Sequence, residues 1–152
     1  MRRCVLSVGY LGFIPGAPGT YASVLALGIY LAGTHLGAPG WVWAASAGFA
    51  AVVLVALGVP TDAKTGSTDP GWCVLDEVAG AFVAVIGQPL QSPVLTAVGA
   101  LLFFRFFDIL KPPPVNLLER LKGRWGVLAD DLAAGGLANL CLWVLRMVLD
   151  WF

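Results

Sequence analysis

The stretch VLTAVGALLFFRFFDILKPPP, residues 94–114, joins a long apolar run to a charged end. No charge interrupts it before Arg105, after which Asp108 and Lys111 follow at intervals of three residues. Residues three apart are neighbours on the surface of a helix. The three prolines that follow lack backbone donors and cannot continue a helix. The stretch therefore predicts an apolar helix over about 94–110 that carries its charges at its C-terminal end.

The composition of the whole chain indicates that this helix belongs to a membrane protein. Of the 152 residues, 59% are hydrophobic and only 12% are charged, whereas a soluble domain is about half apolar and about a quarter charged. Apolar stretches that approach the roughly 20 residues needed to cross a bilayer recur along the chain. We predict an all-α polytopic membrane helical bundle of about five spans, a single domain over residues 1–152. The other spans are expected at about 20–36, 40–59, 73–87 and 130–151.

The distribution of charge predicts the orientation of the bundle. If the N-terminus is cytoplasmic, eight of the nine basic residues fall on inside segments, and the outside turns at 37–40 and 88–93 carry no charge. The positive-inside rule therefore favours a cytoplasmic N-terminus. Acidic residues gather on the same side, so polar chemistry is collected at one face. The eight basic residues are Arg2, Arg3, Lys64, Arg105, Lys111, Arg120, Lys122 and Arg124.

Three charged clusters at that face are candidates for a functional site. They are Asp76 with Glu77, then Arg105 with Asp108 and Lys111, and finally Asp130 with Asp131. Charges within a membrane are costly and usually mark function. The structural alternative is that Arg105 and Asp108 form an ion pair and that Asp130 complements a helix N-terminus. Five carboxylates and two cations from three helices are harder to explain that way.

The chemistry of these side chains points to a metal and a phosphate. Crowded carboxylates repel unless a cation joins them, and carboxylate oxygens suit Mg²⁺, which often binds phosphate as well. Arginine offers a fork for phosphate oxygens, and lysine offers a point charge. The clusters therefore predict metal-assisted phosphoryl chemistry at the cytoplasmic face, in which the metal polarises the phosphoryl group, activates water or orients both.

Two further patterns support a site at this face. Small residues that continue the acidic clusters along their helices allow close helix packing, and Asn139 is expected to hydrogen-bond across helices. In GAPGTYAS, residues 16–23, Pro18 can set the entry turn and Thr20 can cap the first helix. The free N–H groups of that helix start can also cradle a phosphate, with the Thr20 and Ser23 hydroxyls nearby. The small-residue stripes are Asp76, Gly80 and Ala84, and Asp131, Gly135 and Asn139.

Four ordered motifs together resemble the phosphatidylglycerophosphatase A family. They are GxxPxAPGTxxS, DPGxxxxDExxG, FRxFDxxKPxP and DDLxAG, and the resemblance covers about residues 9–135. Ala22 and the turn at 124–126 depart from the usual pattern without removing a charged group. The resemblance implies a Mg²⁺-dependent phosphatase of the bacterial inner membrane, multi-pass, with its active site facing the cytoplasm. It would remove the terminal phosphate from phosphatidylglycerophosphate to give phosphatidylglycerol. The matching positions are Pro18, Gly19, Thr20, Ser23, Asp69, Asp76, Glu77, Gly80, Arg105, Asp108, Lys111, Pro112, Asp130, Asp131 and Gly135.

Roles for these residues follow as hypotheses. Arg105 and Lys111 are expected to hold the phosphate, with Thr20 and Ser23 close by. Asp108 is expected to orient one of the two cations or to join the metal shell. Attack by water is favoured over a covalent aspartyl-phosphate. The expected Mg²⁺ ligands or ligand supports are Asp76, Glu77, Asp130 and Asp131.

Other classes of function receive less support. A small membrane transporter or ion-binding channel subunit would place its acids near the bilayer midplane, whereas here they cluster at one face. A nucleic-acid partner is not expected, because the net charge is zero and no basic run occurs. The sequence predicts a lipid substrate and a bilayer environment, and it leaves the oligomeric state open.

Overall fold

The computed structural model describes residues 1–59, 70–118, 121 and 124–149. Within these residues the regular secondary structure is entirely helical, which confirms the predicted all-α class. The family-motif residue Asp69 and the basic residues Lys64, Arg120 and Lys122 lie outside the described residues. The elements are α1 Arg2–Leu6, the 3₁₀ turn η1 Leu11–Phe13, α2 Pro18–His35, α3 Trp41–Leu57, α4 Leu75–Val83, α5 Pro93–Leu110, α6 Val115–Leu118 and α7 Arg124–Leu149.

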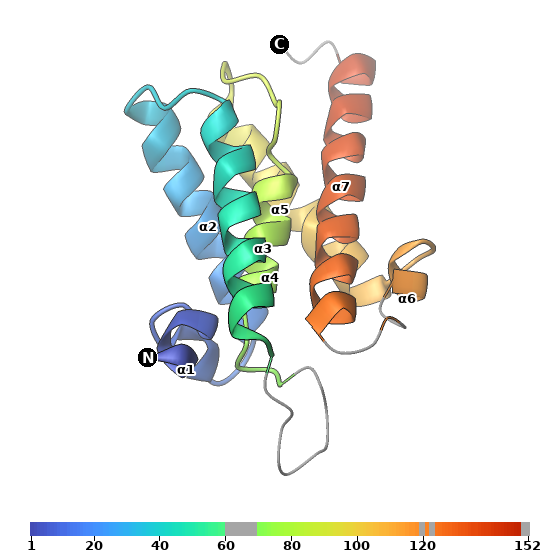
Figure 1. The fold of residues 1–152 in the computed structure, drawn as a ribbon. Coiled ribbons are helices and arrows are strands. Elements are labelled where there is room, and N and C mark those ends of the chain that lie inside the picture. The colour runs from blue at the N-terminus through green and yellow to red at the C-terminus, as the bar shows by residue number, and fades with distance from the viewer. Residues whose placement is uncertain (60–69, 119–120, 122–123, 150–152) are drawn as a thin grey trace.

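The long helices α2, α3, α5 and α7 run along a bundle that encloses the short helix α4 (Figure 1). α4 packs against α2, α3, α5 and α7; six of its nine residues are buried and none is exposed. We call one end of the bundle the α1 end; it holds α1, α6 and the first turns of α2, α4 and α7 (Figure 1). The last turn of α7 lies at the other end, which we call the far end.

Two of the helices are long and apolar enough to cross a membrane, α5 and the stretch Trp125–Val148 of α7. α3 is also apolar but shorter. Along α5, side chains such as Leu102 and Ile109 expose 65% and 70% of their surface. Exposed apolar faces of this kind mark contact with a membrane or a partner. Length, composition and these exposed faces together suggest an association with membrane.

The third predicted span, 73–87, differs most from its prediction. Only Leu75–Val83 is helical, nine residues in all, which is a length of about 14 Å at 1.5 Å per residue. Turns follow, and Gly87 takes a left-handed conformation with φ of 69°. The helix is therefore much shorter than the roughly 30 Å hydrocarbon core of a bilayer.

Asn139 of α7 explains how α4 can end inside the bundle. Its Nδ2 donates to the carbonyl oxygens of Val83, Ala84 and Ile86 at 3.0, 3.1 and 2.8 Å. Gln88 Nε2 in turn donates to the backbone and side-chain oxygens of Asn139 at 3.2 and 3.3 Å. The last carbonyls of a helix have no partner within it, and buried ones need another donor. Asn139 therefore makes cross-helix hydrogen bonds, as the sequence predicted.

Glycines bring α4 and α7 into close contact. A Cβ atom on Gly80 would lie 2.7 Å from the carbonyl oxygen of Asp131 and 2.6 Å from the ring of Phe104. A Cβ on Gly135 would lie 3.0 Å from the carbonyl carbon of Gly80. Any larger residue would push the helices apart, so the predicted small-residue stripes do form the contact. This packing brings the acids of α4 and α7 together.

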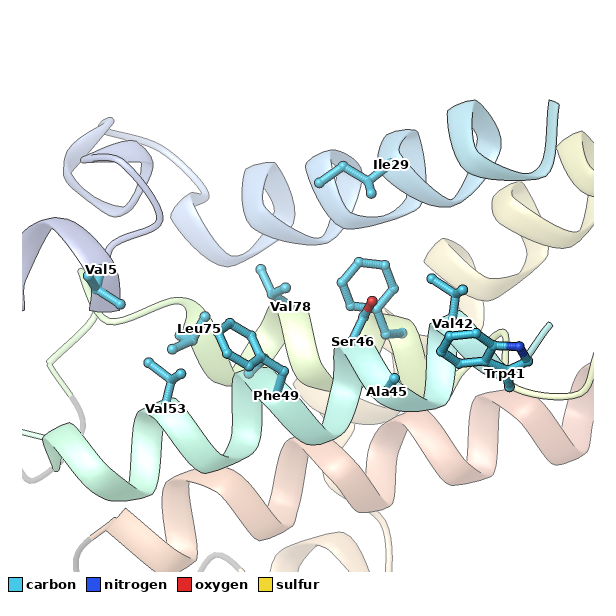
Figure 2. Close-up of a pocket in the computed structure, with 12 residues that line it drawn as sticks. Val5, Ile29, Trp41, Val42, Ala45, Ser46, Phe49, Val53, Leu75 and Val78 are labelled. Carbon is cyan, nitrogen blue, oxygen red and sulfur yellow. The ribbon is translucent and has the colours of Figure 1, made fainter. Parts of the chain in front are cut away.

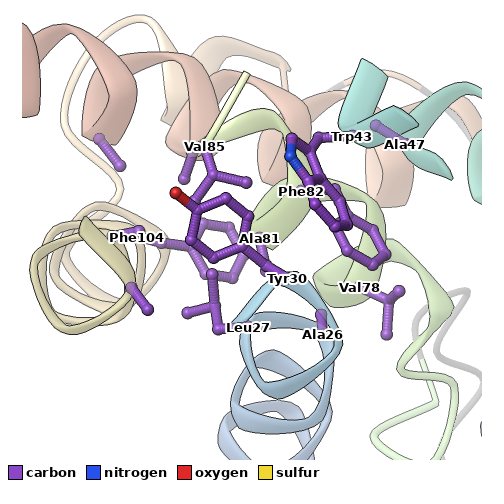
Figure 3. Packing of buried hydrophobic residues seen from close by; sticks show 14 of the residues in the cluster. Ala26, Leu27, Tyr30, Trp43, Ala47, Val78, Ala81, Phe82, Val85 and Phe104 are labelled. Carbon is purple, nitrogen blue, oxygen red and sulfur yellow. The ribbon is translucent and has the colours of Figure 1, made fainter. Parts of the chain in front are cut away.

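A cluster of buried aromatic rings holds α2, α3, α4 and α5 together (Figure 3). Tyr30 and Trp43 meet edge to face with their centroids 5.1 Å apart, and Trp43 and Phe82 stack at 6.2 Å. Phe104 is fully buried beside them. Aromatic pairs in these geometries add to the stability that their burial provides, so the core fixes the positions of the helices that carry the charges.

An apolar groove of about 550 Å³ opens between α2 and α3 (Figure 2). Leu75, Val78 and Phe82 of α4 line it together with residues of α1, α2 and α3. Successive residues of a helix are about 100° apart. The three groove residues therefore lie on a different face of α4 from Asp76 and Gly80, so the groove is separate from the charged cluster.

Candidate functional site

The centre of the site is a group that we call the acid triad, Asp76, Glu77 and Asp131. Each contributes a carboxylate oxygen, and these oxygens all lie within 4.8 Å of one another. Asp76 and Glu77 occupy the first turn of α4, where the helix dipole favours negative charge. Asp131 comes from α7, and both aspartates are buried, with 3% and 4% of their surface exposed. Two elements far apart in the sequence thus converge on one cluster of oxygens.

The start of α2 lies against this cluster through Gly19. A Cβ atom on Gly19 would overlap Glu77 Oε1 and would lie 3.0 Å from Nη1 of Arg105. Gly19 belongs to a family motif of the sequence, but no role was predicted for it. The signal was the APGT sequence itself, since a glycine at a helix start allows close approach of another group. The first backbone N–H groups of a helix lack intrahelical partners, so α2 also brings donors to this place.

Of the two hydroxyl residues at this helix start, Thr20 does not make the predicted cap, and Ser23 forms a hydrogen bond within the helix. α2 begins at Pro18, and its N-cap residue is Ala17, which makes no side-chain cap hydrogen bond. Thr20 therefore lies inside the first turn and does not cap the helix. Ser23 is buried, and its Oγ donates to the carbonyl of Gly19 at 2.8 Å. Its hydroxyl stabilises the first turns of α2 by this bond.

Arg105 and Asp108 link α5 to the acid triad. Arg105 Nη1 lies 2.6 Å from Asp108 Oδ2, so the ion pair considered as the structural alternative does form. Asp108 also interacts electrostatically with Asp131. Like charges on neighbouring carboxylates repel each other. A cation among them would relieve this repulsion.

Lys111 and Asp130 form a second ion pair beside the triad. Lys111 Nζ lies 2.9 Å from Asp130 Oδ2. α7 begins at Arg124, so Asp130 lies in its second turn and does not complement the helix N-terminus, as one alternative had proposed. The span predicted at about 130–151 therefore begins six residues earlier, and the predicted turn at 124–126 is helical. The structure thus brings Asp76, Glu77, Asp108, Asp131 and Arg105 together and pairs Asp130 with Lys111.

Similarity to known proteins identifies the family of this chain. The family model described as phosphatidylglycerophosphatase A matches residues 4–146. This chain belongs to the phosphatidylglycerophosphatase A family. A Haemophilus influenzae protein named phosphatidylglycerophosphatase A is 32% identical over 93% of this chain and 87% of its own length. A Bacteroides thetaiotaomicron protein, provisionally named phosphatidylinositol-3-phosphatase, is 32% identical over 91% of this chain and 89% of its own. No solved structure matches the chain significantly.

Membership of the phosphatidylglycerophosphatase A family confirms the resemblance and makes this protein a lipid phosphatase. The chemistry of its charged end fits that class. The acid triad offers only oxygen donors, which divalent hard cations prefer. Arg105 lies within the same cluster and suits phosphate oxygens. The triad oxygens are close enough together to hold one cation among them.

Proposed function

We propose that this phosphatase hydrolyses the phosphate monoester of phosphatidylglycerophosphate to phosphatidylglycerol and phosphate, with Mg²⁺ as cofactor, in bacterial phospholipid synthesis. The acid triad carries the proposal, because three carboxylates this close repel one another unless a cation or a proton joins them, and oxygen-only donors suit Mg²⁺. The Haemophilus influenzae relative supports the choice of lipid by its name.

Asp76, Glu77 and Asp131 would hold the metal in this proposal. When bound, Mg²⁺ would neutralise charge on the phosphoryl oxygens. Arg105 donates to the phosphate from beside Glu77, and Asp108 orients the guanidinium through the 2.6 Å ion pair. The oxygen of a water molecule bonds to phosphorus, and a carboxylate of the triad takes a proton from that water. The bond between phosphorus and the glycerol oxygen breaks, that oxygen takes up a proton from water, and the carboxyl group of the triad returns its proton to water.

A purified, detergent-solubilised sample tests this proposal. We expect it to release phosphate from phosphatidylglycerophosphate when Mg²⁺ is present and to stop when a chelator removes the metal. Restoring Mg²⁺ should restore turnover, which separates loss of the ion from denaturation. A folded sample that releases no phosphate would favour the transporter or channel alternative. Trapping of a phosphorylated aspartate would contradict direct attack by water.

A second substrate is supported by the Bacteroides thetaiotaomicron relative, whose provisional name assigns it phosphatidylinositol-3-phosphate. The two lipids differ in the group that carries the phosphate, so the same metal and cation chemistry serves both. Competition between the two substrates in mixed micelles separates them. We expect a higher kcat/KM for phosphatidylglycerophosphate, and the reverse order would assign this chain to the other lipid.

We further propose an inner-membrane, multi-pass placement with the α1 end facing the cytoplasm. α2, α3, the α4 segment, α5 and α7 would make about five passes, of which the α4 pass is only partly helical. Single-cysteine variants test the orientation in spheroplasts with a maleimide that cannot cross membranes. Gly40→Cys, between α2 and α3, should react, whereas Leu117→Cys in α6 should react only after permeabilisation. The opposite pattern would reverse the orientation.

A further inference from the structure

Two adjacent aspartates of α7 face different partners. Asp131 belongs to the acid triad with Asp76 and Glu77. Asp130 instead lies 2.9 Å from Lys111 Nζ at the end of α5. Successive helical residues differ in direction by about 100°, and here the two neighbouring carboxylates reach different partners. Their division between two partners suggests two different roles.

Both carboxylate oxygens of Asp130 are already engaged. Oδ2 accepts from Lys111 Nζ, and Oδ1 accepts from the backbone N–H of Asp131 at 3.1 Å. The Asp130 side chain is only 9% exposed, so water contributes little to its solvation. A cation among the triad oxygens would compete with Lys111 for Asp130, and Asp130 is not among the carboxylates whose oxygens gather within 4.8 Å. Asp130 is therefore poorly placed as a metal ligand.

The backbone at Lys111 is held in an uncommon conformation. Its φ of 44° and ψ of 54° are left-handed, a region that is unfavourable for a residue with a side chain. Such strain persists where surrounding contacts hold the residue, often at functional sites. Pro112 follows and stops the helix, and the ion pair with Asp130 fixes the other end of the side chain.

We propose that Asp130 is a positioning residue that holds the Lys111 ammonium beside the acid triad to bind the phosphate of the substrate. This inference rests on the proposed function. Three carboxylates and one divalent cation keep a net negative charge, which repels a phosphate monoester. The Lys111 ammonium carries a positive charge and donates to Asp130 Oδ2 in this pair. The pair thus sets a fixed positive group next to Asp131.

Three variants separate this role from that of a metal ligand: Asp130→Asn, Asp131→Asn and Lys111→Met. The first measurement is Mn²⁺ binding to each purified protein without substrate, by titration calorimetry. We expect Asp131→Asn to weaken Mn²⁺ binding about tenfold or more, because it removes a metal ligand. Asp130→Asn should leave Mn²⁺ binding within about twofold of the wild type, because it removes only an ion pair. Equal losses in the two aspartate variants would overturn the proposal.

The second measurement is the KM for the lipid and the inhibition constant for inorganic phosphate. Asp130→Asn and Lys111→Met should each raise both constants roughly tenfold, the scale of one charged hydrogen bond, with a smaller change in kcat. Because the two residues act as one unit, the double variant should be no worse than Lys111→Met alone. Asp130→Glu, which keeps the charge, should recover part of the loss. Independent, multiplying losses would contradict the proposal.

These measurements also distinguish failure of this inference from failure of the proposed function. If the wild-type protein releases no phosphate from the lipid, the proposed function fails, whereas the Mn²⁺ comparison still decides whether Asp130 is a ligand. If Asp130→Asn does not fold, Asp130→Glu and Lys111→Met report on the same ion pair. Mn²⁺ binding weakened by Lys111→Met as strongly as by Asp131→Asn would count against a separate phosphate role.

Discussion

The two ends of the bundle both contain buried polar groups, but they satisfy them differently. At the far end, the Arg146 guanidinium donates to the Thr96 hydroxyl, which in turn donates to the carbonyl of Ser92 at 2.9 Å. At the α1 end, the carboxylates of Asp76 and Asp131 lie with Glu77 in a cluster of like charge. The Thr96 hydroxyl at the far end finds both its donor and its acceptor within the protein, whereas the acid triad requires a proton or a cation. A buried polar group therefore indicates function here only where the protein leaves like charges together.

The sharpest test of this contrast is Asp76→Asn. The change keeps the shape of the side chain but removes one of the three charges that would hold the metal. We expect kcat to fall at least about a thousandfold, since metal stabilisation of phosphoryl charge amounts to several kcal/mol. Phosphate release measures the loss, and the melting temperature should not fall, because one source of repulsion is gone. Turnover near the wild-type rate would exclude Asp76 from the metal site.

A smaller loss is expected from Gly19→Ala at the start of α2. The new Cβ would overlap Glu77 Oε1 and approach Arg105. Displacement of about 1 Å in an active site can cost a hundredfold in rate, so we expect kcat/KM to fall about ten- to a hundredfold. Gly28→Ala is the matched control, because it lies on the same helix and its Cβ would meet nothing within 4 Å. Equal activity of the two variants would remove Gly19 from the site.

The contact between α4 and α7 at the α1 end could be predicted from the spacing of acids and glycines in the sequence. Gly80 and Gly135 fall four residues after Asp76 and Asp131. Residues four apart lie on the same face of a helix, so each acid lies on the face that forms the contact between α4 and α7. The bounds of α2, α3 and α5 also lie within two residues of their predictions, because glycines and prolines flank these helices.

Other features could not be predicted because they depend on distant partners. Apolar residues continue past Val83, so hydropathy predicted a full span, while the donors that allow α4 to end there come from Asn139 in α7. Adjacent positions for Asp130 and Asp131 predicted one shared role, whereas their directions depend on how α7 packs. The ion pair with Lys111 shows that direction, and a single sequence does not record it.

Arg146→Met should reveal a structural role at the far end. Loss of the bond to Thr96 would leave buried polar groups less well satisfied, at a cost of about 1–3 kcal/mol. We expect a lower melting temperature in detergent but a kcat within about twofold of the wild type for the folded fraction. Met147→Ala is the control, because Met147 is 74% exposed. A large fall in kcat at unchanged stability would show that the far end takes part in catalysis.

The smallest effect is expected from Ala45→Phe in the groove between α2 and α3. Ala45 is exposed and lines this groove, and the groove contacts a face of α4 that does not carry Asp76. A larger apolar side chain there leaves the acid triad unchanged, so kcat should stay within about twofold for lipids of any chain length. The measurement compares a short-chain with a long-chain phosphatidylglycerophosphate. A raised KM for the long-chain lipid alone would mean that the groove holds an acyl chain, and the charged and apolar faces of α4 would then serve one substrate.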